Sequence, residues 1–458
     1  MLGFHGLNMV AKLPPYLPSA VGFGTDDAAF LAQNGFDVVR LGVIYRAVEP
    51  MPGVYDDNYL NGIAATVQQL GARGVYTLLD FHQDQYNERF HGEGFPDWAV
   101  QDDGLANTPD HGFPGNYTTM PALEHAFDSL WADAPGPGGV GLQERYAAAW
   151  AHVAARFAGD DHVLGYDLFN EPWPGSAWPS CVSSSGCPAF EAKLGALEAK
   201  VIAAIRGADP KHLVWYEPNG SFNLGQAETQ LPNFHDPRAG MSFHDYCSST
   251  TAVACISPEQ LVLDKALRRS RKTGDALLLT EFGATNDVAT LTRVETDADA
   301  IRMPWIEWAY CGCSDPTTSA IPADSEALVL DPEQSPQGAN LVHATLGALV
   351  RPYPLVVAGT PARFGFDPKK RVFNLSYSTA RAGGRSRFRA GACTQVFVPA
   401  LQYPHGYSAR VSGARVISRR GSGTLELASR RGAKKVRVKL TAAKHGRTAA
   451  PKLTAGCR

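Results

Sequence analysis

Eight short runs rich in β-branched, aromatic and leucine residues recur through the first 350 residues, and stretches with the apolar spacing of helices separate them. This alternation is typical of βα units, in which helices connect and cover parallel strands. Eight units predict a (β/α)8 TIM barrel, with a doubly wound open sheet as the alternative. The runs lie at residues 2–8, 36–43, 75–82, 163–170, 213–218, 240–246, 276–283 and 304–310.

A long irregular insertion at residues 84–140 separates the third run from the fourth and is rich in Gly, Pro, Asp and aromatic residues. Loops of this length in a compact domain are usually functional or disordered. The aromatic side chains favour an ordered wall, and they are Trp98, Phe113, Tyr117 and Trp131.

The sequence changes character after a last helical pattern at residues 340–350, which leads into Arg-Pro-Tyr-Pro at 351–354. Beyond this point short strand patterns alternate with Gly, Ser and Pro turns, as in a β-sandwich. A chain of 458 residues also exceeds the size at which single cores stop growing. We therefore predict a catalytic barrel at residues 1–351 and a β-sandwich at 352–458.

The two predicted domains differ sharply in charge. Residues 361–458 hold 22 of the 42 Lys and Arg residues but only 2 of the 45 Asp and Glu residues, a formal charge of +20. The basic residues alternate with apolar ones, so they read as solvent faces of strands. Such a surface attracts anionic partners. An anionic membrane or micelle surface, or an acidic glycan, fits an extracellular protein better than nucleic acid, which we do not expect; a plain solvated face is the alternative.

Cysteine usage favours an oxidising compartment. The eight cysteines include two closely spaced pairs, Cys181 with Cys187 and Cys247 with Cys255, which suit small disulfide loops. Free buried thiols are the alternative, and the spacing of Cys311 and Cys313 is too tight for an easy mutual bridge. No run of apolar residues is long enough to cross a bilayer. We expect a secreted protein whose leader is not present in this sequence, and a monomer.

Polar and aromatic residues gather near the carboxyl ends of six of the eight runs. In a (β/α)8 barrel this end forms the mouth that holds the active site. One such residue is commonly only a satisfied strand-end group, but six strands together predict a site. The residues are Arg40, Asp80, His82, Asn170, Glu171, His244, Tyr246, Glu281, Trp305 and Trp308.

Glu171 and Glu281 carry the predicted chemistry. Two carboxyl groups facing each other about 5 to 5.5 Å apart suit a retaining glycosidase, in which one attacks the anomeric carbon and the other moves the proton. Their pKa values must differ, which requires neighbours that distinguish them. Tyr246 and Arg40 can hold Glu281 ionised, and His244 can share a proton with the acid. Asn170 can donate to a sugar hydroxyl, and Trp305 or Trp308 can stack on a sugar ring.

Several motifs resemble glycoside hydrolase family 5: LFNEP, an upstream DFHQD, FHDY and TEFG. In that family the acid/base follows an Asn on the fourth strand and the nucleophile ends the seventh, which implies Glu171 as acid/base and Glu281 as nucleophile. Within the family, GFHGLNMVAKLPPY, LLDFHQDQY, NEPWPG, the RPYP junction and the trailing sandwich resemble the endoglycoceramidases. These enzymes cleave the bond between the reducing-end sugar of a glycosphingolipid and its ceramide.

The resemblance covers the whole chain and implies further site residues. Lys12 and Asp80 would bind polar groups of the sugar beside the scissile bond, with His82, Asn170 and Tyr246 around them. A ceramide substrate also calls for an apolar groove, for which residues 172–178 and the aromatic insertion are candidates. Neither a cofactor nor a metal is implied.

Three other hypotheses stay open at this point. The chain can be a family 5 glucanase or mannanase acting on soluble polysaccharide, or a glycan-binding protein without activity. It can also be a metal-dependent hydrolase that uses His5, His82, Asp84 and His244 as ligands, although the paired glutamates would then be unexplained.

Overall fold

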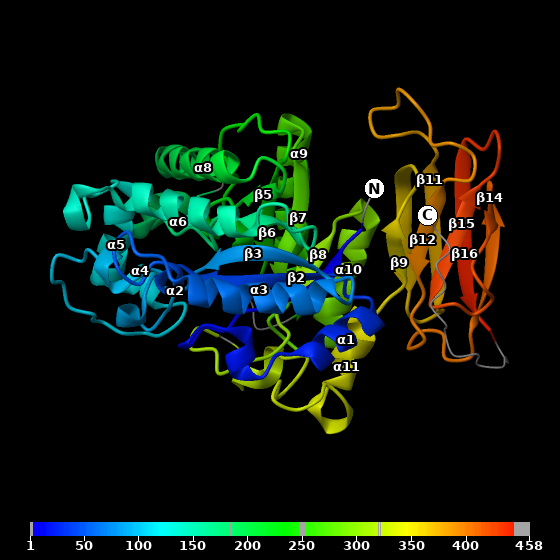
Figure 1. Ribbon diagram of the computed structural model, residues 1–458, viewed down its shortest axis with the longest axis horizontal. Helices are drawn as coiled ribbons and strands as arrows, with labels where there is room; N and C mark the ends of the chain where they lie inside the picture. The colour runs from blue at the N-terminus through cyan, green and yellow to red at the C-terminus, as the bar shows by residue number, and fades with distance from the viewer. Residues whose placement is uncertain (1–2, 184, 248–251, 319, 321, 444–458) are drawn as a thin grey trace.

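The computed structural model describes residues 3–183, 185–247, 252–318, 320 and 322–443. Within this part, eight parallel strands close a barrel in the order of the sequence, so that β1 pairs with both β2 and β8 (Figure 1). The closed barrel confirms the (β/α)8 prediction and excludes an open sheet. Its strands are β1 (His5–Met9), β2 (Val38–Ile44), β3 (Tyr76–His82), β4 (Val163–Asp167), β5 (Leu213–Tyr216), β6 (Ala239–Asp245), β7 (Ala276–Phe282) and β8 (Trp305–Glu307).

Helices that cover the barrel bury an apolar face, as α3 illustrates. In α3 the buried residues Leu60, Ile63, Val67 and Leu70 recur every three or four positions, which places them on one face of the helix. The helices are α1 (Thr25–Asn34), α2 (Tyr45–Val48), α3 (Asp57–Gly71), α4 (Asn116–Thr119), α5 (Pro121–Trp131), α6 (Leu142–Phe157), α7 (Trp178–Cys181), α8 (Pro188–Ala208), α9 (Ala252–Thr273), α10 (Val288–Ile301) and α11 (His343–Leu349).

The insertion at residues 84–140 is an ordered wall that contains α4 and α5. Its predicted aromatic residues pack into or against the main core: Trp98, Phe113, Tyr117 and Trp131. The indole of Trp131 also donates to the carbonyl of Trp173, 2.8 Å away, which ties the insertion to the loop after β4. Tyr117 and Trp131 are buried in this packing, whereas Trp98 and Phe113 stay partly exposed.

The C-terminal domain consists of two antiparallel four-stranded sheets, in the orders β10-β11-β16-β13 and β14-β15-β12-β9. Their buried residues form a core of their own, in agreement with the predicted sandwich. The predicted boundary at residue 351 lies between α11 and β9. The strands are β9 (Tyr353–Val356), β10 (Thr360–Asp367), β11 (Val372–Ser378), β12 (Cys393–Phe397), β13 (Tyr407–Ser412), β14 (Ala414–Val416), β15 (Thr424–Ser429) and β16 (Lys435–Ala442).

The sandwich packs against the end of the barrel where the strands begin. The ring of His5, at the start of β1, stacks on Tyr353 at 3.8 Å between centroids and on Trp305 at 4.0 Å. The hydroxyl of Tyr353 donates to the carbonyl of Gly35, 2.8 Å away, just before β2. The mouth of the barrel therefore faces away from the sandwich (Figure 1).

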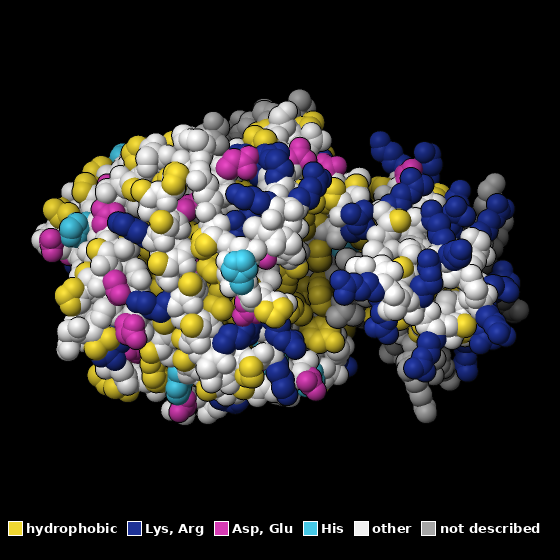
Figure 2. All heavy atoms as spheres, turned by 90° about the horizontal axis from the view of Figure 1, so that it is seen from above, with side chains coloured by type: hydrophobic (Ala, Val, Ile, Leu, Met, Phe, Trp, Pro, Cys, Tyr) yellow, Lys and Arg dark blue, Asp and Glu magenta, His cyan; other side chains and the backbone are white. Residues whose placement is uncertain are grey.

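The basic residues of the sandwich lie on solvent faces, as predicted. Along β16 the exposed Lys435, Arg437 and Lys439 alternate with buried apolar residues. Cross-strand pairing sets Arg410 opposite Lys439. Figure 2 shows Lys and Arg side chains spread over the sandwich with few acidic ones among them.

Disulfide bonds join Cys181 to Cys187 and Cys247 to Cys255. A third bond joins Cys311 to Cys313, contrary to the expectation that these two are too close to bridge. The backbone turns at Cys313, which has a positive φ of 46°. This turn brings the side chains of Cys311 and Cys313 together. Among the described residues, no helix has both the length and the apolar character that a membrane span requires.

Candidate active site

Glu171 and Glu281 meet at the mouth of the barrel beside His244. Glu281 lies on β7, and Glu171 follows β4 in a left-handed backbone conformation, with φ of 44°. Such a conformation costs a non-glycine residue about 1–3 kcal/mol and is typical of functional sites. Nδ1 of His244 lies 2.8 Å from Oε1 of Glu171 and 3.4 Å from Oε2 of Glu281. The two carboxyl groups are therefore close enough for a retaining glycosidase.

A single guanidinium, that of Arg40 on β2, fixes the floor of the site. It is fully buried and donates through Nε to Asp167 at 2.8 Å and through Nη2 to Asn170 at 2.9 Å. Its Nη1 donates to both Glu281 and Asn8. Nη2 also lies 3.0 Å from Asp80. Residues from five segments of the barrel thus converge on one cation, which sets their relative positions.

Glu281 is surrounded by hydrogen-bond donors. Oε1 accepts from Arg40 and Oε2 accepts from the hydroxyl of Tyr246 at 2.9 Å. Burial raises the pKa of Glu281, while the charge of Arg40 acts in the opposite direction. Because both oxygens accept hydrogen bonds from these side chains, the arrangement favours the carboxylate, which is the nucleophilic form.

Glu171 has a different environment. Burial, together with the negative charge of Asp84, raises the pKa of Glu171 to about 7. Two side chains contact Oε1 of this carboxyl group: Nδ2 of Asn223 donates to it at 3.1 Å, and Nδ1 of His244 lies 2.8 Å away. The side chain is 23% exposed. Oε2 is thus left to carry a proton toward a substrate, which suits a general acid.

Lys12 lies beside this pair in a buried polar cluster. Its ammonium group contacts Asp84 at 2.7 Å, Asp315 at 2.8 Å and the hydroxyl of Thr317 at 2.7 Å. It also lies 4.6 Å from the centre of the Trp308 ring, within cation–π range. Trp308 directly follows β8 at the mouth, where its ring also stacks on His82 at 5.4 Å between centroids.

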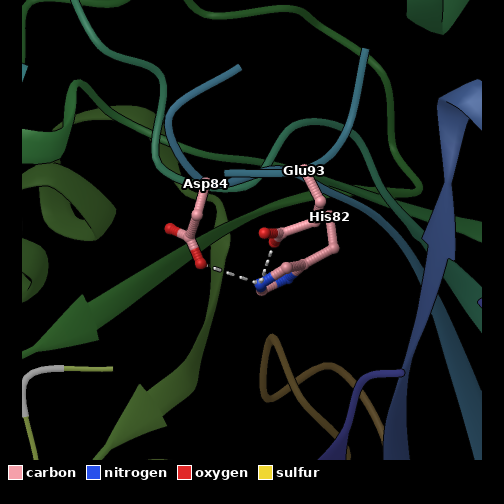
Figure 3. Close-up of side chains that lie close together, drawn as sticks. All are labelled: His82, Asp84 and Glu93. Atoms are coloured by element: carbon pink, nitrogen blue, oxygen red, sulfur yellow. Dashed lines mark ion pairs between the residues drawn. The ribbon is translucent and has the colours of Figure 1, made fainter. Parts of the chain in front are cut away.

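His82 joins this cluster to the barrel floor. Its Nδ1 lies 2.8 Å from Asp80, and its Nε2 lies 3.6 Å from Asp84 and 4.0 Å from Glu93 (Figure 3). Burial opposes the charge on the ring, but hydrogen bonds to Asp80 and Asp84 raise the pKa of His82 to about 10. The ring is therefore a cation held between carboxyl groups at neutral pH.

Three comparisons place the chain among known proteins. The family model described as cellulase (glycosyl hydrolase family 5) matches residues 24–313, and the glycoside hydrolase family 5 C-terminal domain matches residues 351–441. Endoglycoceramidase I of Rhodococcus hoagii (strain 103S) is 31% identical over 434 residues, covering 91% of this chain and 80% of that protein. The chain belongs to the endoglycoceramidases of glycoside hydrolase family 5.

Solved structures agree with this family. Endo-glycoceramidase II from Rhodococcus sp., solved as a lactosyl-enzyme intermediate, has a TM-score of 0.79 at 28% identity. The same enzyme in complex with ganglioside GM3 has a TM-score of 0.76 at 27% identity. In both cases the match covers 96% of this chain and 97% of the other.

Two predicted sugar-binding residues of this endoglycoceramidase lie elsewhere. Trp305 begins β8 at the end of the barrel opposite the mouth, where it is fully buried against His5, so the prediction that it binds the sugar is wrong. Asp80 is also fully buried and is held by Arg40 and His82, beneath the mouth. Asp84, which contacts Lys12, occupies the position that we predicted for Asp80.

Asn170 lies at the site, and its side-chain amide already forms two hydrogen bonds with other residues. Oδ1 accepts from Arg40, and Nδ2 donates to the carbonyl of Gln83 at 3.0 Å. One hydrogen of Nδ2 is left for a sugar hydroxyl.

The sequence analysis missed Glu217 and Asn223. Glu217 directly follows β5 and is fully buried beside His244, and Asn223 bonds both Glu171 and Glu217. The signal was present, because Glu-Pro follows the fifth strand at 217–218 as it follows the fourth at 171–172.

The four residues of the metal hypothesis, His5, His82, Asp84 and His244, do not form one ligand set. His5 begins β1, whereas His82 ends β3 and His244 lies near the end of β6, so His5 is at the opposite end of the parallel barrel. His82, Asp84 and Glu93 do lie close together, but a histidine must be neutral to bind a metal, whereas His82 is cationic. Lys12 already pairs with Asp84 there.

Proposed function

We propose that this chain hydrolyses the β-glycosidic bond between the oligosaccharide and the ceramide of glycosphingolipids, with retention of configuration. The observation that carries this proposal is that two neighbouring glutamates, Glu171 and Glu281, differ in their hydrogen bonds and in their surroundings. Glu281 accepts hydrogen bonds at both oxygens, whereas Glu171 is contacted by described side chains at Oε1 alone, and burial and Asp84 raise its pKa to about 7. A nucleophile and an acid/base are required in that combination.

The reaction follows from these roles in two steps. In the first, a carboxylate oxygen of Glu281 bonds to the anomeric carbon while Glu171 gives its proton to the departing ceramide oxygen. In the second, Glu171 takes a proton from water, the oxygen of that water bonds to the anomeric carbon, and the ester to Glu281 breaks. Arg40 and Tyr246 then receive the carboxylate of Glu281 again.

The remaining residues suit a supporting role. Lys12 and Asp84 present a donor and an acceptor beside Trp308, as a sugar with several hydroxyl groups requires. His82 and Asn170 extend this polar surface, and His244 contacts both glutamates. Rhodococcus endo-glycoceramidase II, solved as a lactosyl-enzyme intermediate and in complex with ganglioside GM3, supports the same substrate class here.

Mass analysis of the products tests this proposal. Incubation with lactosylceramide, with a ganglioside and, in parallel, with cellulose oligomers should give intact oligosaccharide plus intact ceramide from the lipids only. Cleavage of the oligomers with no ceramide released would favour a family 5 polysaccharide hydrolase instead.

We propose further that the basic sandwich brings the enzyme to an anionic lipid surface. Support comes from the row of Lys435, Arg437 and Lys439 on β16, although this row lies in the domain opposite the mouth. Replacing all three by Glu should abolish co-sedimentation with vesicles of anionic lipid. The same reversal at exposed residues of the barrel, Arg73, Arg271 and Lys272, is the matched control. Equal binding by both variants would contradict the proposal.

The disulfides support an extracellular, oxidising location. We also propose that the enzyme is a monomer, which light scattering would test against its mass of 49.2 kDa.

A further inference from the structure

Glu217 is a third carboxyl group next to the catalytic pair, and the proposed reaction gives it no role. It is fully buried, and its Oε2 accepts from the backbone N–H of Glu171 at 3.1 Å. Its Oε1 accepts from Nδ2 of Asn223 at 3.1 Å. It therefore contacts the acid/base through both the backbone and a shared amide.

One nitrogen of the His244 imidazole lacks a hydrogen-bond partner among the described residues. Its Nδ1 faces the two catalytic glutamates, whereas its buried Nε2 has no hydrogen-bond partner among the described residues. Oε1 of Glu217 lies 3.5 Å from this nitrogen. Hydrogen bonds at catalytic sites are often long before substrate binds, so this carboxyl group is the natural partner of Nε2.

The charge around Glu217 disfavours a carboxylate. The negative charges of Asp167 and Glu281 lie near it, with the cation of Arg40 as the opposing charge. Burial and these carboxylates raise the pKa of Glu217 well above its usual range. His244 is neutral as well, because burial lowers its pKa to about 3. A neutral acid can donate where a carboxylate cannot.

We propose that Glu217 is a positioning residue that, as a neutral carboxylic acid, donates from Oε1 to Nε2 of His244. The proton on Oε1 of Glu217 removes a buried negative charge. It also provides a hydrogen-bond donor for Nε2 of His244. Nε2 becomes the acceptor of the ring, and the ring proton must lie on Nδ1.

This tautomer determines which oxygen of Glu171 carries the acid proton. With hydrogen on Nδ1, both His244 and Asn223 donate to Oε1 of Glu171, so its proton stays on Oε2 and is available to the substrate. The same N–H stabilises the carboxylate that remains after proton transfer. The opposite tautomer would place a lone pair against Oε1 and hold the proton there, away from the leaving group.

The inference rests on the proposed function, and its kinetic test compares two leaving groups. Glu217→Ala removes the donor, and it should lower kcat/KM for lactosylceramide by about 100-fold, within the range of general acid catalysis. For a β-lactoside with a dinitrophenolate leaving group, which needs no protonation, the loss should be less than about fivefold. Equal losses on both substrates would reveal a merely structural role and overturn the proposal.

Two further variants sharpen this comparison. Glu217→Gln keeps an N–H for Nε2 and an oxygen for the backbone of Glu171, although it loses the bond from Asn223. It should retain the wild-type ratio between the two substrates. Glu198→Gln changes another buried carboxyl group, which accepts from the backbone N–H of Glu217 at 3.1 Å, and should also leave the ratio unchanged.

Nitrogen NMR of histidine-labelled protein tests the tautomer directly and needs no activity. The signals of His244, assigned by their loss in His244→Gln, should show a protonated Nδ1 and an unprotonated Nε2 in the wild type and in Glu217→Gln. Glu217→Ala should shift hydrogen to Nε2. Finding hydrogen on Nε2 in the wild type would overturn the inference, whereas absence of lipid hydrolysis would overturn the proposed function only.

Discussion

The Nη1 of Arg40 and the Oε1 of Glu281 form a hydrogen-bonded ion pair that is almost completely shielded from solvent. The same guanidinium contacts Asp80 and Asp167, so one cation offsets three carboxylates. Such a cation is hard to replace, because loss of one partner leaves buried charges unpaired.

Arg40→Lys should lower kcat by about 100-fold, since an ammonium group cannot reproduce the fork of donors that positions Glu281. It should also reduce the free energy of unfolding by about 3–5 kcal/mol. Kinetics and denaturant unfolding measure the two effects. Arg46→Lys, at a partly exposed ion pair with Asp97, should change stability by no more than about 0.5 kcal/mol. Equal behaviour of the two variants would contradict the role of Arg40.

The dependence of kcat/KM on pH should follow Glu171. Burial and the charge of Asp84 raise its pKa to about 7, and the acid works only while protonated, so kcat/KM should fall as pH rises through about 7. Asp84→Asn removes a negative charge that favours the protonated form, so the alkaline limb should move to lower pH. Asp315→Asn removes the other carboxylate partner of Lys12 and should shift the limb less. An unmoved limb in Asp84→Asn would refute this origin.

A chelator should leave the activity unchanged. The cluster around His82 already holds two positive charges, the ammonium of Lys12 and the imidazolium of His82, whose pKa is about 10. Binding of a metal there would require His82 to lose a proton. Dialysis against EDTA followed by assay with lactosylceramide measures this. Loss of activity that a divalent cation restores would revive the metal hypothesis.

Arg351 should stabilise the junction between the two domains. Its buried guanidinium lies 2.9 Å from Glu295 and 3.1 Å from Asp299, both on α10. Arg351→Leu would leave those carboxyl groups without their cation and should cost about 3–5 kcal/mol of unfolding free energy, without changing kcat in the folded enzyme. Arg410→Leu, at an exposed position on β13, is the control. Equal melting temperatures for both variants would contradict this role.

The barrel, and the position of Glu171 and Glu281 together at its mouth, could be predicted from the sequence because both depend on local patterns. Strand and helix periodicities alternate clearly, and the end of a strand fixes the end of the barrel at which Glu171 and Glu281 lie. The disulfide between Cys311 and Cys313 depends on a backbone turn that residue spacing does not reveal.

The predicted positions of Asp80 and Trp305 differ from the structure because residue spacing does not show how far along the barrel axis a side chain lies. Asp80 pairs in register with Asp167, one layer below the mouth, and only the structure shows that Asp84 rises to Lys12. Trp305 and Trp308 belong to one apolar run. Because Trp305 begins β8 and Trp308 follows its last residue, Glu307, Trp305 lies at the end of the barrel opposite the mouth and Trp308 lies at the mouth. Long-range contacts, such as that of Glu217 with His244, depend on tertiary packing.

The central claim is retaining hydrolysis at the bond between glycan and ceramide, and the anomer formed first tests it most directly. Proton NMR during hydrolysis of lactosylceramide should show β-lactose appearing before mutarotation, together with intact ceramide, because two displacements at the anomeric carbon restore its configuration. Glu281→Ala, which lacks the nucleophile, should release neither product. Initial formation of α-lactose, or turnover by Glu281→Ala at the wild-type rate, would contradict the account.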